Sequence, residues 1–170
     1  VDDQVALYEI LLEAAAALGG GPVGGRALGA LRIEKGYGSW GREYSPEYWP
    51  QEAGLHGLIK LDKDFLNKEA YLKISNTPPR ESLTMFEVDV TDNADANGGE
   101  PIFLADGTPV GRVTSGSYGY TVGKSLAIGY AREGVVRAGD SVEIFILGKP
   151  HAATVLDKPP FDAGGERLRA

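Results

Sequence analysis

Short segments with the strand pattern, separated by turn residues, fill the second half of the chain and constrain its fold most. Six segments have this pattern: residues 83–90, 102–104, 110–114, 125–130, 142–147 and 151–156. Asp106-Gly107 lies between the second and third segments, and this pair is typical of a hairpin turn. Short strands at a spacing of about 8–15 residues predict a small antiparallel barrel or sandwich.

The first half of the chain is instead predicted to be mainly helical. Apolar residues spaced by three and four predict a helix over residues 5–18, capped by Asp2 or Asp3. Gly19-Gly20-Gly21-Pro22 follows and ends this helix. Two further helices are expected at residues 26–35 and 64–72.

The two halves meet at Asn76-Thr77-Pro78-Pro79, which has the composition of a linker. We therefore predict an α+β chain with two parts, residues 1–77 and residues 80–170. The first part is a short helical segment, and the second is a small antiparallel β-barrel.

Residues 57–61 have the composition of a short strand, and this strand would need a partner. It could pair with the downstream sheet, or its partners could lie in sequence upstream of Val1. An unmatched strand edge would also promote self-association or association with an N-terminal portion. The absence of an initiator Met leads us to expect a chain trimmed from a longer one.

Composition excludes several classes of function. The net charge of −7 disfavours nucleic-acid binding, which needs clustered Lys and Arg. No run of about 18 apolar residues is present, so no membrane span is expected, and the first residues lack the pattern of a secretory signal. There is no cysteine, and His56 and His151 are the only histidines, so we expect no metal site.

A polar and aromatic stretch around Arg32 is the first candidate for chemistry. Arg32 and Glu34 are two residues apart in a predicted helix, so each needs another partner. One of them, together with Arg26, could hold a carboxylate or a polar heterocycle; the alternative is a structural ion pair. Tyr37 and Trp40 could stack on a flat ligand or pack a loop onto the core.

Two other segments carry weaker signals. Glu52 is an isolated carboxylate, and general acid–base catalysis usually needs a second group that shifts the pKa of the first. Gly123-Lys124-Ser125 lacks the glycine of a phosphate loop, because Tyr118 occupies that position and a strand is predicted to follow. Lys124 could lie over a ligand or in a turn.

Five segments, in order, resemble members of the glycine-cleavage T-protein family, in particular dimethylglycine and sarcosine dehydrogenases. The similar stretches are Leu31-Arg32-Ile33-Glu34-Lys35-Gly36-Tyr37-Gly38-Ser39-Trp40-Gly41, Pro50-Gln51-Glu52-Ala53-Gly54-Leu55, Asp64-Phe65-Leu66-Asn67-Lys68-Glu69-Ala70, the stretch from Val113-Thr114-Ser115-Gly116 through Gly123-Lys124-Ser125-Leu126-Ala127-Ile128-Gly129-Tyr130, and the ending from Pro160 to Arg169.

The resemblance implies the C-terminal part of a folate-binding domain followed by the C-terminal barrel. In such dehydrogenases an FAD domain oxidises an N-methyl group, and the one-carbon unit passes to tetrahydrofolate. The FAD domain and the catalytic aspartate lie upstream of position 1 in this family, so we assign no catalytic residue. The cofactor-binding candidates are Arg26, Tyr37, Trp40 and Arg167.

The implied ligands of the full-length protein are a folate and a small methylated amine. The implied compartment is the cytoplasm, or the mitochondrial matrix in a eukaryote, and a chain without cysteine fits such a reducing compartment. The alternative is a non-catalytic relative of the T-protein that serves as a regulatory or interaction module.

Overall fold

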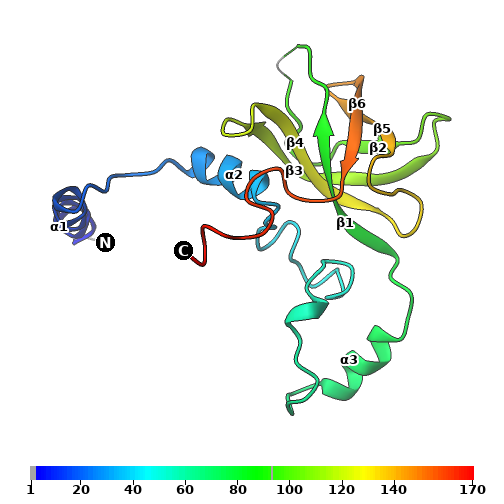
Figure 1. The fold of residues 1–170 in the computed structure, drawn as a ribbon, viewed down its shortest axis with the longest axis horizontal. Helices are drawn as coiled ribbons and strands as arrows, with labels where there is room; N and C mark the ends of the chain where they lie inside the picture. The colour runs from blue at the N-terminus through cyan, green and yellow to red at the C-terminus, as the bar shows by residue number, and fades with distance from the viewer. Residues whose placement is uncertain (1–2, 93) are drawn as a thin grey trace.

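A computed structural model describes residues 3–92 and 94–170 and contains three α-helices followed by a six-stranded barrel (Figure 1). The helices are α1 (Gln4–Ala17), α2 (Gly25–Glu34) and α3 (Lys68–Ser75). The strands are β1 (Glu81–Val88), β2 (Pro101–Phe103), β3 (Pro109–Gly119), β4 (Lys124–Arg132), β5 (Ser141–Ile146) and β6 (Lys149–Leu156). The predicted α+β class is confirmed, and the open choice between barrel and sandwich is settled as a closed barrel.

The barrel closes in the order β1-β4-β3-β2-β5-β6, with antiparallel pairing throughout. Strand β1 closes it by pairing with β4 on one side and with β6 on the other. The inward residues of all six strands form one apolar core, which includes Phe86, Ile102 and Ile144, each with 0% exposure. Burial alternates along β5 and β6, as the strand pattern predicts, whereas β4 is buried on both faces because α2 covers its outer side.

Strand β3 is longer than predicted, because it continues beyond Thr114 to Gly119. A register shift between Val113 and Ser115 interrupts its pairing with β4. Ser115, just beyond the predicted end of this strand, is buried with 1% exposure. Its hydrogen bonds to residues of the first half of the chain explain why a polar residue is tolerated there.

The predicted strand at residues 57–61 is wrong. A single 3₁₀ turn, His56–Leu58, occupies this place, and the described residues that follow contain no strand before β1. The third helix begins at Lys68 rather than at residue 64, because Asn67 adopts a left-handed conformation with φ 66° that ends the preceding loop.

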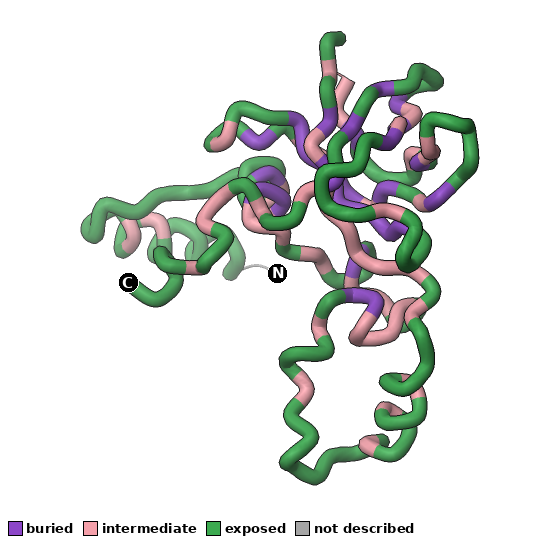
Figure 2. The backbone as a smooth tube through the Cα atoms, turned by 45° about the vertical axis from the view of Figure 1, so that its right-hand side comes forward, coloured by how far each residue is buried: buried purple, intermediate pink, exposed green. Residues whose placement is uncertain are grey.

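The first helix stands apart from the barrel in Figure 1 and is exposed along its length in Figure 2. It contains no buried residue. Asp3 precedes it as expected but makes no side-chain cap hydrogen bond, and Asp2 lies outside the described residues. No helix among the described residues is long and apolar enough to cross a membrane.

Helix α2 differs from α1 because it packs on the barrel. Ala30 and Ile33 are buried, and Ile33 shares a cluster with Leu126 and Ile128 of β4. The first part of the segment after α2 lies against the barrel and brings Glu43 to strand β3 and Glu52 to Arg80 at the start of β1. The rest of the segment extends away from the barrel towards α3 (Figure 1).

Candidate functional site

A groove of about 770 Å³ separates α2 from strand β3 and contains Arg26. Its polar and aromatic lining comes from three parts of the chain: Arg26, Arg32, Arg42, Asp95, Tyr118 and Tyr120. It is therefore built jointly by the helical segment and the barrel, and we take it as the candidate site.

Arg26 lies in the first turn of α2 and is exposed. Within the described residues its guanidinium makes no hydrogen bond or ion pair. The same turn contains no acidic residue, and its N-cap Gly24 supplies no side-chain acceptor. Open N–H groups at a helix start together with a guanidinium favour an anionic ligand.

Arg32 forms a structural ion pair, which was one of the two roles predicted for it. Its Nη1 lies 3.3 Å from Glu43 Oε2, and its Nη2 donates to Ser115 Oγ at 2.7 Å. Arg32 also donates to the carbonyl of Tyr37 at 3.0 Å. The guanidinium is thus committed to protein acceptors.

Glu43 is the centre of this buried network and has 0% exposure. Its carboxylate accepts hydrogen bonds from the hydroxyls of Thr114 and Ser115, both at 2.6 Å, and from the Ser39 N–H at 2.7 Å. Burial by itself raises the pKa of Glu43, but these hydrogen bonds and the charge of Arg32 outweigh it and hold the pKa below its usual value. An ionised, fully bonded Glu43 fastens the loop after α2 to strand β3.

Glu34 makes no contact with Arg32, as predicted from their spacing of two residues in a helix. Its Oε1 accepts the backbone N–H of Thr121 at 2.8 Å, and its carbonyl accepts the N–H of Phe161 at 3.2 Å. Lys35, next to it, pairs with Asp162 at 2.8 Å and lowers the pKa of that carboxyl group. The end of α2 is therefore tied to the β3–β4 turn and to the C-terminal segment.

Glu52 is also structural. Arg80 donates to both of its oxygens, at 2.8 and 2.7 Å, and the Trp49 N–H donates at 2.8 Å. The hydrogen bonds from Arg80 are the main reason that the pKa of Glu52 falls to about 2, despite burial. A carboxylate with this pKa and no free oxygen is unsuited to act as a general base near neutral pH.

The structure does not gather the four predicted cofactor-binding residues in one place. Arg26 lines the groove, whereas Tyr37 and Trp40 lie beyond the other end of α2 with 49% and 83% exposure. The guanidinium of Arg167 lies 5.2 Å from the ring centre of Phe161 in the C-terminal segment. None of these last three lines the groove.

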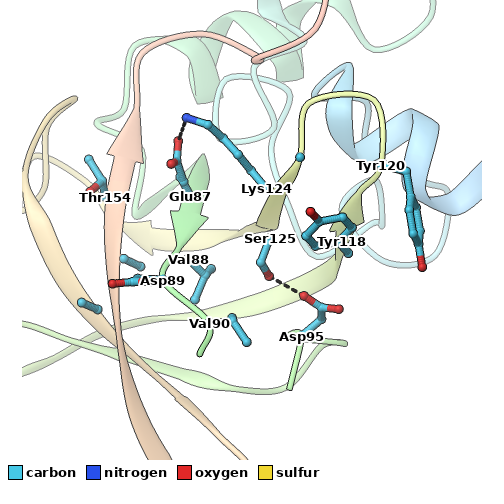
Figure 3. Close-up of a pocket in the computed structure, with 13 residues that line it drawn as sticks. Glu87, Val88, Asp89, Val90, Asp95, Tyr118, Tyr120, Lys124, Ser125 and Thr154 are labelled. Atoms are coloured by element: carbon cyan, nitrogen blue, oxygen red, sulfur yellow. Dashed lines mark hydrogen bonds and ion pairs between the residues drawn. The ribbon is translucent and has the colours of Figure 1, made fainter. Parts of the chain in front are cut away.

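A second cavity, of about 950 Å³, opens at the barrel end beside the groove (Figure 3). Lys124 pairs there with Glu87 at 2.6 Å, and Ser125 Oγ donates to Asp95 at 2.6 Å. Lys124 begins strand β4, so the chain continues as a strand where a phosphate loop would require a helix. Its charge is already paired on the protein surface.

Sequence reasoning missed Arg42, Glu43, Tyr118 and Tyr120. Glu43 offered no signal, because its partners lie 71 and 72 residues away in the chain. Tyr118 and Tyr120 lie inside the family-like Thr-Ser-Gly to Gly-Lys-Ser stretch, so their two aromatic rings on one hairpin were a usable signal.

Comparison with known proteins agrees with these motifs. A family model described as the glycine cleavage T-protein C-terminal barrel domain matches residues 82–162, and one described as the GCVT N-terminal domain matches residues 1–63. A crystal structure of the glycine cleavage system aminomethyltransferase T from Bartonella henselae superimposes with a TM-score of 0.71. It is 24% identical and covers 81% of this chain and 38% of that one, which shows a shared fold.

Three curated relatives are similar over nearly the whole chain. Mitochondrial dimethylglycine dehydrogenase of Mus musculus is 39% identical, over 93% of this chain and 18% of the relative. The 4-methylaminobutanoate oxidase (formaldehyde-forming) of Paenarthrobacter nicotinovorans is 36% identical, over 99% and 20%. The aminomethyltransferase of Thermotoga neapolitana is 32% identical, over 96% and 44%.

The barrel, the preceding helices and these similarities place the chain in a class whose members include proteins named aminomethyltransferase and dimethylglycine dehydrogenase. The chain belongs to the glycine-cleavage T-protein family, as its motifs predicted. It spans about a fifth of the length of the first relatives that it matches and less than half of the aminomethyltransferase.

Proposed function

We propose that this chain is the C-terminal, tetrahydrofolate-associated portion of an enzyme that transfers a one-carbon unit from an N-methylated amine to tetrahydrofolate. Residues 1–77 would complete the folate-binding domain, and residues 80–170 would be its barrel. The relatives named dimethylglycine dehydrogenase and aminomethyltransferase support this assignment. FAD would belong to a separate domain, outside these residues.

The observation that carries the proposal is the groove at the start of α2. Arg26 is uncompensated there, and the groove separates two of the family-like motifs. A folate ends in carboxylates, and a guanidinium without a protein partner is suited to bind them. Of the four predicted cofactor-binding residues, only Arg26 lines the groove, and we keep it as the proposed folate contact there. Tyr37, Trp40 and Arg167 would contact only a part of the folate that extends beyond the groove.

Titration of 5-formyltetrahydrofolate by calorimetry tests this function. We expect weak binding by the 170-residue chain and tighter binding by the polypeptide of the complete reading frame, with Arg26→Gln weakening both. Arg137→Gln is the matched control, since Arg137 is an exposed arginine outside the groove. Tight binding by the 170-residue chain alone, or none by the complete polypeptide, would contradict the proposal.

The second candidate function is a non-catalytic module of the same family. Glu43 and Glu52 are committed to structural hydrogen bonds, so under either candidate these residues supply no acid–base catalyst, and a catalytic residue would have to lie upstream of Val1. The sequence encoded before Val1 separates the two: an FAD fingerprint and the family's catalytic aspartate support the enzyme. For the compartment we propose the cytoplasm or the mitochondrial matrix, and the mitochondrial dehydrogenases among the relatives favour the latter in a eukaryote.

A further inference from the structure

The loop between β1 and β2 contains the one asparagine of the chain that precedes a glycine, in the pair Asn97-Gly98. The other asparagines are Asn67, Asn76 and Asn93, which precede Lys, Thr and Ala. In an Asn-Gly pair no Cβ shields the glycine nitrogen, so this nitrogen reaches the side-chain carbonyl carbon of the asparagine more easily than in other pairs. Asn97 is also exposed to water. The reaction that such a pair favours is deamidation.

The fold requires the glycine at this place. Gly98 has φ +127°, a conformation that L side chains rarely adopt, and a Cβ on it would lie 2.5 Å from the carbonyl oxygen of Thr114 in β3. The loop is tied to the strand there, because the Gly99 N–H donates to the Val113 carbonyl at 2.8 Å and the Val113 N–H donates to the Glu100 carbonyl at 2.8 Å. The close approach of the loop to β3 therefore keeps a chemically labile pair in the sequence.

Three hydrogen bonds hold the groups that would react. The Glu100 carboxylate accepts the Gly98 N–H at 2.8 Å and the Asn97 N–H at 2.9 Å. Arg42 donates to the Asn97 carbonyl at 3.2 Å. A carboxylate that accepts a hydrogen bond from an N–H group opposes the loss of that proton, and bonds on both sides of Asn97 restrict its rotation. The Gly98 nitrogen is therefore a poorer nucleophile here than in a free peptide.

We propose that Asn97 is a deamidation site of this chain and that Glu100 restrains the reaction in the folded state. In the reaction the Gly98 nitrogen bonds to Cγ of Asn97, and the bond from Cγ to the side-chain nitrogen breaks. That nitrogen leaves as ammonia and takes the proton of the Gly98 N–H. Water then opens the cyclic imide at either carbonyl, which gives aspartate or isoaspartate. Solvent water is the only co-reactant, and the reaction is independent of the proposed function.

The products change the charge at the edge of the groove. Asn97 and Arg42 both line it, so deamidation puts a new carboxylate on the residue that Arg42 contacts. Isoaspartate also carries the main chain through Cγ, which lengthens the backbone by one atom and displaces the Gly98 N–H from Glu100. Both products are therefore separable from the original chain by charge, and isoaspartate also disturbs the contact of the loop with β3.

Incubation of the 170-residue chain in mildly alkaline buffer, followed by peptide mapping with mass spectrometry, tests the site. We expect deamidation at Asn97 before any other asparagine, but more slowly than in a synthetic peptide of residues 94–101, where Glu100 is not held against the Gly98 N–H. Loss of the charged acceptor should accelerate the reaction about tenfold in Glu100→Ala, and less in Glu100→Gln, because Gln retains a neutral acceptor. Glu13→Ala removes an exposed carboxylate of α1 and should react at the wild-type rate.

Asn76 is the internal control for a general loss of structure in the variants. Its side-chain amide donates to the Leu72 carbonyl at 2.9 Å, and unfolding of the chain would accelerate deamidation there as well. Acceleration confined to Asn97, in variants that thermal melts show to be folded, supports the restraint by Glu100. An equal rate in Glu100→Ala and the wild type, or a wild-type rate equal to that of the peptide, overturns the restraint. Deamidation of another asparagine before Asn97 overturns the site.

Discussion

Replacing Glu43 by Ala should be among the most damaging single changes to this chain. The substitution removes the acceptor of Thr114, Ser115 and the Ser39 N–H, and it leaves Arg32 with 19% side-chain exposure and no carboxylate. Breaking a buried pair by removing one partner costs about 3–5 kcal/mol. In a chain of this size each kcal/mol lowers the melting temperature by about 2–4 °C. We expect a drop of roughly 6–20 °C in thermal unfolding followed by circular dichroism.

Glu87→Ala is the matched control for this prediction. Glu87 pairs with Lys124 at 2.6 Å, which is shorter than the 3.3 Å between Glu43 and Arg32. The side chains of Glu87 and Lys124 are both partly exposed. Such surface pairs contribute about 0–1 kcal/mol, so the melting temperature should fall by at most a few degrees. An equal loss in the two variants would refute the reasoning that burial and the number of donors, rather than distance, decide the strength of these pairs.

Three further changes test the same framework. Glu52 has a pKa of about 2, below its unfolded value, so its ionised form stabilises the fold fully above about pH 5 and this stabilisation is lost as the pH falls towards 2. In Glu52→Gln the free energy of unfolding should therefore change less between about pH 5 and pH 2 than in the wild type. Gly36 has φ +71°, and a Cβ there would lie 2.6 Å from Pro159, so Gly36→Ala should lower the free energy of unfolding by about 1–3 kcal/mol. The loss should be smaller for Gly54→Ala, because φ is also +71° there but no atom lies within 4 Å of the added Cβ; urea unfolding measures both variants. Tyr130→Phe removes a buried hydroxyl that donates to a backbone carbonyl at 2.7 Å and should cost about 1 kcal/mol by the same assay, whereas no change would mean that the carbonyl finds another donor.

The barrel could be predicted from the sequence because its information is local. Each of the six predicted strands overlaps an observed one, and the Asp106-Gly107 turn is present, with Asp106 accepting the N–H of Thr108 at 2.9 Å. Period-two alternation and turn residues determine such elements over a few positions. The same holds for α1 and α2, which are bounded by glycine-rich segments.

The strand expected at residues 57–61 shows where local information fails. Leu58, Ile59 and Leu61 give a short apolar run, which strands and irregular segments share. A strand also needs a neighbour for its backbone groups, and that is not encoded in five residues. In the structure Leu58 is 75% exposed and belongs to a 3₁₀ turn. Leu61 is also exposed, and only Ile59 is half-buried, so the apolar residues of this run are largely uncovered by the described residues.

The family-like motifs turn out to mark the joints between the helical segment and the barrel. Arg32 and Glu34 bond to strand β3 and to the β3–β4 turn, and Glu52 bonds to Arg80 at the entrance of β1. Hydrogen bonds and ion pairs of this kind offset the cost of burying these charges, although Glu34 Oε2 has no hydrogen-bond partner among the described residues.

Arg32 and Glu52, bonded in this way, have no free group left for a ligand. The same reasoning directs attention to three side chains in the groove: Arg26, which makes no hydrogen bond or ion pair among the described residues, Arg42, which donates only to backbone carbonyls, and the exposed Tyr120. Arg42 lies outside the stretches that resemble the family, whereas Tyr120 lies inside one of them. In this chain the motif residues therefore explain how the groove is assembled, and the uncommitted side chains between them are where ligand recognition is to be tested.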